Sequence, residues 1–97
     1  MTINTLVKKI AESVVADHAY AENRIIRSTS DFTEADLEEI ETMRNQIFRI
    51  LYNSNGRKWH DVFAEIKCVT GADSFIGFKA QDKIIATCAN YGIVFEV

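Results

Sequence analysis

The chain of 97 residues is 47% hydrophobic and has a net charge of −3. This length and composition predict a single globular domain, residues 1–97, and exclude a disordered chain. No stretch approaches the roughly 18 consecutive apolar residues of a membrane span, and the first residues lack the basic region and apolar core of a signal peptide, so we expect neither feature. The sequence has no proline and only four glycines, a usage that favours long helices.

The N-terminal third predicts one long helix, from Thr2 to about Arg27. Its length would be roughly 25 residues, or about 38 Å. His18 stands where the apolar pattern is interrupted, so we expect it to be a partly exposed residue at a kink or a pH-sensitive contact. The apolar positions recur at steps of three and four residues, as on one face of a helix, at Ile3, Val7, Ile10, Val14, Ala21 and Ile25.

The next segment predicts a second helix, Glu34–Tyr52, after a polar link short enough to favour an antiparallel helical hairpin with the first. Thr33 is followed three residues later by Asp36, which is close to a capping box. The acidic start and the later Arg44 and Arg49 also suit the helix dipole. The apolar stripe of this helix comprises Leu37, Ile40, Met43, Ile47 and Leu51.

Two shorter helices are predicted in the C-terminal half, at Lys58–Val69 and Gln81–Tyr91. The expected buried face of the first comprises Trp59, Val62, Phe63 and Ile66. Residues 75–78 and 93–97 are strand-like in composition, and the sequence leaves open whether they pair as a two-stranded ribbon. The predicted fold class is therefore mainly α, built on the helical hairpin, and becomes α+β if the ribbon forms.

Catalytic, metal and cofactor sites find little support in the sequence. Cys68 and Cys88 have no His at ligand spacing, so both are expected to be buried, reduced thiols. His60 and Asp61 are adjacent in a predicted helix and should diverge by about 100°, which leaves no triad with Ser74. We expect a protein that is not an enzyme and that binds no cofactor and no metal.

The acidity of the chain is local, because residues 31–41 hold six carboxylates and no basic residue. Four of them follow one another at steps of three, four and three residues, which would align them along one side of a helix, and the other two widen the row. A plain explanation is a solvated helix face that suits the dipole. The functional interpretation is a rigid anionic ladder that docks into a Lys- and Arg-lined groove, and its candidate partner-binding residues are Asp31, Glu34, Asp36, Glu38, Glu39 and Glu41.

A small proline-free domain with one dense acidic helix and no catalytic motif resembles the phage-encoded anti-CRISPR proteins of the type I-F group, some of which imitate DNA. The resemblance is one of overall character across the whole chain. It implies a non-catalytic inhibitor in the host bacterial cytoplasm that binds a basic Cas surveillance complex in place of target DNA. It further implies no direct contact with nucleic acid or membrane, and we expect a monomer rather than a dimer.

Two other functions remain open at this point. The first is a helical homo-oligomeric interaction module, with the first two helices forming the contact between copies. The second is a small DNA-binding regulator, for which the basic candidates are Arg57, Lys58, Lys79 and Lys83, although an acidic domain opposes contact with phosphates.

Overall fold

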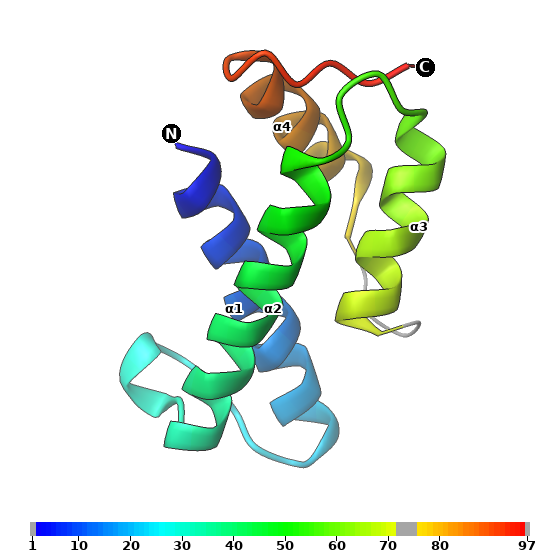
Figure 1. Cartoon of the computed structure of the whole chain (residues 1–97). Coiled ribbons are helices and arrows are strands. Elements are labelled where there is room, and N and C mark those ends of the chain that lie inside the picture. Colours follow the sequence, from blue (N-terminus) through cyan, green and yellow to red (C-terminus); the bar gives the residue numbers. More distant parts are fainter. Residues whose placement is uncertain (1, 72–75, 97) are drawn as a thin grey trace.

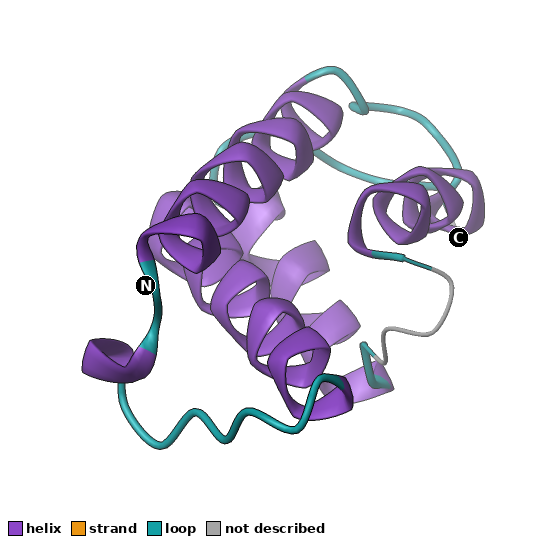
Figure 2. Ribbon diagram, turned by 90° about the horizontal axis from the view of Figure 1, so that it is seen from below, coloured by secondary structure: helices purple, strands orange, loops and turns teal. Residues whose placement is uncertain are grey.

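The computed structural model describes residues 2–71 and 76–96. Within these ranges the regular elements are helices only (Figure 2), so the mainly α prediction is confirmed. Helices α1 and α2 pack side by side, and their chains run in opposite directions (Figure 1). Helix α3 packs on α2 and α4 packs on α1. The elements are α1 (Ile3–Ala21), the 3₁₀ helix η1 (Thr29–Asp31), α2 (Glu34–Tyr52), α3 (Trp59–Thr70) and α4 (Phe78–Ala89).

Helix α1 is shorter than predicted. It begins where the Thr2 hydroxyl accepts a hydrogen bond from the Thr5 amide at 3.1 Å. It ends because Asn23 adopts a left-handed conformation, with φ of 65°, and the Arg24 amide donates back to the carbonyl of Ala19. The chain therefore leaves the helix axis six residues before the predicted end. Ile25, expected in the buried stripe, is 64% exposed.

Helix α2 has the bounds that the sequence predicts. The Thr33 hydroxyl accepts from the Asp36 amide and the Asp36 carboxylate accepts from the Thr33 amide, which completes a capping box. The buried stripe differs from the prediction at its first position, because Leu37 is exposed and Asp36 takes the inward place. The other predicted stripe residues, Ile40, Met43, Ile47 and Leu51, are buried.

The two-stranded ribbon of residues 75–78 with residues 93–97, which the sequence leaves open, is not seen among the described residues. Phe78 is the first residue of α4, and Phe75 and Val97 lie outside the described residues. The C-terminal segment instead runs beside the α2–α3 link. The amide of Glu96 donates to the carbonyl of Arg57 at 2.8 Å, and the amide of Trp59 donates to the carbonyl of Glu96 at 2.9 Å.

Two further contacts tie residue 94 to the same link. The Gly56 amide donates to the Val94 carbonyl at 2.8 Å, and the Val94 amide donates to the Asn55 side-chain oxygen at 2.9 Å. Phe95 lies on the buried side, with its ring centre 5.0 Å from that of Trp59. The strand-like composition thus reflects a segment that does need a backbone partner, but the partner is the link between α2 and α3, which turns at residues 55–57, rather than a second strand.

One hydrophobic cluster runs through all four helices and the C-terminal segment, including Val7, Ile47, Ile66, Ile84 and Phe95. Both cysteines are free, as expected. Burial of Cys88 raises the pKa of its thiol to about 11. Cys68 was expected to be buried but is exposed. No described helix is both long enough and apolar enough to cross a membrane.

Candidate acidic interface

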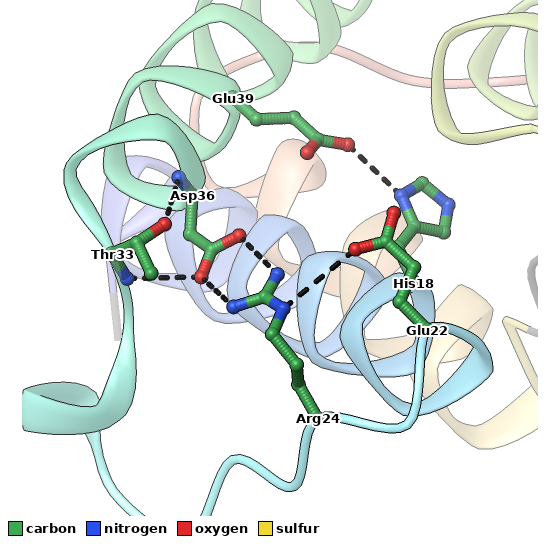
Figure 3. Close-up of polar contacts among 6 residues, drawn as sticks. All are labelled: His18, Glu22, Arg24, Thr33, Asp36 and Glu39. Atoms are coloured by element: carbon green, nitrogen blue, oxygen red, sulfur yellow. Dashed lines mark hydrogen bonds and ion pairs between the residues drawn. The ribbon is translucent and has the colours of Figure 1, made fainter.

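Asp36 is the most constrained of the six candidate carboxylates. The Arg24 guanidinium donates to both of its oxygens, at 2.9 and 2.8 Å, and the Thr33 amide donates at 2.9 Å (Figure 3). The hydrogen bonds from Arg24, and then that from the Thr33 amide, hold the pKa of this carboxyl well below its usual range. The expectation that Asp36 belongs to an exposed row is wrong, because only 5% of the residue is exposed.

Arg24 reaches Asp36 because α1 stops early and the chain turns back toward the start of α2. Its Nε atom also lies 3.7 Å from a carboxylate oxygen of Glu22 (Figure 3). The apolar pattern of the sequence does not predict this contact between Arg24 and Asp36. Part of the signal was nevertheless present in the sequence, because the residue three positions after the N-cap of a capping box turns its side chain back toward the cap.

Asp31 also leaves the predicted row. It lies in η1, ahead of α2, and one of its carboxylate oxygens accepts from the amides of Arg27 and Ser28 at 2.8 and 3.1 Å. These two backbone hydrogen bonds lower the pKa of the Asp31 carboxyl. The side chain is occupied in shaping the loop before α2, so it does not continue the helical ladder.

Glu39 and Glu41 are exposed on α2 but are paired with basic side chains. One Glu39 oxygen lies 2.9 Å from His18 Nδ1 on α1 (Figure 3). Glu41 accepts from Arg44 at 2.5 Å, and this hydrogen bond lowers the pKa of its carboxyl. The Glu41 side chain remains 60% exposed despite the pair. The Arg44 guanidinium therefore offsets part of the predicted negative surface.

Glu34 and Glu38 are the two candidates that remain exposed and unpaired within the described residues. They stand four residues apart on α2, and Glu41 follows three residues later, so the three share one stripe. Glu38 and Glu39 also line a hollow of about 350 Å³ with Thr42 and Gln46, beside the end of α3. The exposed anionic surface is thus narrower than predicted: Glu34, Glu38 and Glu41, with Glu39 at its side.

The described residues offer little catalytic machinery. They contain no group of three or more His, Cys, Asp or Glu side chains that could hold a metal ion. His60 Nδ1 lies 3.6 Å from a carboxylate oxygen of Asp61, which is closer than expected for adjacent helical residues, but both side chains are largely exposed. Ser74 lies outside the described residues.

Comparison with protein-family models, curated proteins and solved structures finds no match to this chain.

Proposed function

We propose that this protein is a non-catalytic inhibitor that binds the basic, nucleic-acid-binding surface of a partner through the exposed face of α2. The observation that carries the proposal is the stripe of Glu34, Glu38 and Glu41, two of which are unpaired in the described structure. By the resemblance noted above, the partner is a type I-F Cas surveillance complex in the bacterial cytoplasm, and the contact blocks its target DNA.

The charge density of the stripe supports imitation of a nucleic-acid strand. Glu34 and Glu41 are seven residues apart, which is about 10.5 Å along a helix. Three carboxylates therefore occupy a length in which one DNA strand presents about three phosphates, at roughly 3.4 Å of axis each. The similarity concerns linear charge density and needs no similarity of shape.

Like charges at these spacings repel by a few tenths of a kcal/mol per pair, so the stripe costs the free protein some stability. The capping box and the core face of α2 hold the helix in place regardless. A stripe fixed in this way loses little conformational entropy on binding. The hollow beside Glu38 and Glu39 adds a place for a lysine or arginine side chain of the partner.

The test is a mobility-shift competition in which the protein is incubated with a type I-F surveillance complex before target DNA is added. The wild-type protein is expected to prevent DNA binding, more strongly at low salt because the contact is electrostatic. A variant with Glu34→Lys and Glu38→Lys is expected to lose inhibition by at least about 100-fold, since each reversal replaces an attraction with a repulsion.

The matched control reverses two other exposed carboxylates, Asp61→Lys and Asp82→Lys, which gives the same net charge away from the stripe. This control should inhibit like the wild-type protein. Inhibition by the stripe variant at low salt would contradict the proposal, as would equal loss in both variants. Failure of the wild-type protein to bind any such complex would reject the partner class.

A second candidate function, self-association through the hairpin, is favoured by one observation. Ile25 and Leu37, which flank the Arg24–Asp36 pair in sequence, are 64% and 51% exposed. A second copy covering this end of the hairpin would remove both side chains from water. Light scattering at micromolar concentration decides: a dimer that Leu37→Asp converts to monomer supports this function, and a monomeric wild-type protein rejects it.

A further inference from the structure

A pocket of about 420 Å³ lies between α1 and α4, formed by residues that the acidic stripe does not include. Its floor is aliphatic: Leu6, Ile10 and Val14 come from α1, Ile76 from the segment before α4, and Ala80 from α4. A volume of this size falls in the range of small-molecule pockets, which combine an apolar lining with a few polar groups that orient the ligand.

Three lysines also line the pocket, Lys9 from α1 and Lys79 and Lys83 from α4, and the remaining lining residues are Ser13 and Gly77. The three lysines are half of the six in a chain whose net charge is −3. No carboxylate lines the pocket, and the three ammonium groups form no ion pair within the described residues. Lys79 and Lys83 stand four residues apart on one helix, a like-charge arrangement that an anion between them would relieve.

The floor is held in place by side chains outside the pocket as well as by the core. Gln81 donates from Nε2 to the carbonyl of Ile76 at 3.1 Å and accepts from Trp59 Nε1 at 3.0 Å. These two hydrogen bonds tie the segment before α4 to α3. The apolar surface under the lysines is therefore preformed, and a ligand need not order it.

We propose that this pocket binds an amphipathic anion, namely a free aliphatic carboxylate whose chain lies on the apolar floor and whose head group meets the three lysines. Charge complementarity selects the head group, because the described lining residues carry three positive groups and no negative one. The aliphatic floor favours a ligand with an alkyl chain, because removal of apolar surface from water is favourable and does not depend on a specific contact geometry. This inference does not depend on the function proposed for the acidic stripe.

Isothermal titration calorimetry with hexanoate, octanoate and decanoate, all well below the concentrations at which they form micelles, tests both halves of the proposal. Affinity is expected to rise about fourfold for each added methylene until the pocket is filled. Octanol, the neutral counterpart of octanoate, is expected to bind at least about tenfold more weakly than octanoate.

Variants locate the site. Lys79→Gln with Lys83→Gln should weaken octanoate binding at least about tenfold and leave octanol binding unchanged. Ala80→Leu, which fills the floor with a good helix former, should weaken both ligands. Lys8→Gln, a lysine next to the pocket residue Lys9 but outside the lining, should change neither.

Four results would overturn the proposal: no binding of decanoate by the wild-type protein, equal affinity for octanoate and octanol, affinity independent of chain length, or an unchanged affinity in the Lys79 and Lys83 variant. Circular dichroism of each variant separates loss of the pocket from loss of the fold. If the double lysine variant unfolds, the single change Lys83→Gln replaces it and should likewise weaken octanoate binding and leave octanol binding unchanged.

Discussion

The Asp36 carboxylate accepts hydrogen bonds from Arg24 and from the Thr33 amide while it is almost fully buried. Its charge thereby completes the cap of α2 and joins that cap to the loop after α1. Asp31 accepts hydrogen bonds from the backbone amides of Arg27 and Ser28 and so shapes the loop that leads into α2. Acidic residues that look alike in sequence therefore divide into some that hold the helix and others that face outward.

Stability should fall in acid because of the structural carboxylates. The pKa values of Asp31, Asp36 and Glu41 are lower in the folded protein than their ordinary values, so the folded state binds fewer protons than the unfolded state. Their stabilisation is present above the ordinary values near pH 4 and is lost as the pH falls through the folded values.

Replacement of Asp36 by Asn tests whether one of these carboxylates contributes to the loss of stability in acid. The variant should be less stable than wild type near pH 7, because Arg24 loses its partner charge, and the difference should shrink below about pH 4 as the Asp36 carboxyl of the unfolded wild-type chain protonates. Urea unfolding at several pH values measures both effects. The exposed control Asp82→Asn should change stability by no more than about 0.5 kcal/mol, and a wild-type-like pH profile for Asp36→Asn would contradict the assignment.

The helices differ in how well local sequence predicts them. Both ends of α2 depend on nearby residues, Thr33 with Asp36 at the start and Asn53 at the stop, so its bounds follow from the sequence. The end of α1 depends on the left-handed Asn23 and on a contact between Arg24 and Asp36 that spans twelve residues. A periodic pattern that continues to Ile25 cannot report a tertiary contact of this kind.

A single substitution can weaken the N-terminal cap of α2 without changing the Asp36 carboxylate. Thr33→Ala removes the hydroxyl acceptor for the Asp36 amide and should cost about 1 kcal/mol in the free energy of unfolding. Thr42→Ala, in the interior of the same helix, is the control, and alanine's higher helix propensity should keep stability equal or raise it slightly. Thermal unfolding of both variants gives the comparison, and equal destabilisation would argue against a specific capping role.

At the scale of the whole molecule, the sequence predicts the mainly helical fold and the hairpin but not the partner of the C-terminal segment. Residues 93–97 were predicted to be strand-like, and within the described residues they form one isolated parallel bridge, between Glu96 and Lys58. Their backbone partner, the link at 55–59, has too few residues and too polar a composition to be recognised as part of a ribbon. The pocket between α1 and α4 was likewise hidden, because its three lysines come from two helices whose contact the sequence does not reveal.

The core predicts a sharp contrast between two isoleucines. Ile47 is fully buried in the cluster, and Ile47→Ala should lower the free energy of unfolding by about 2–5 kcal/mol. Ile25 is largely exposed, so Ile25→Ala should change it by less than about 0.5 kcal/mol. Chemical denaturation distinguishes the two variants, and a large effect at Ile25 would instead point to burial by another molecule.

The docking of residues 94–96 on the α2–α3 link has a consequence for the order of folding. The α1–α2 hairpin joins neighbours along the chain, whereas the hydrogen bonds of Gly56 and Trp59 to the C-terminal segment close a loop of nearly forty residues. This closure should be the slower event. The amide hydrogens of Gly56, Trp59 and Glu96 should then exchange with solvent through one shared opening, separately from those in the middle of α2.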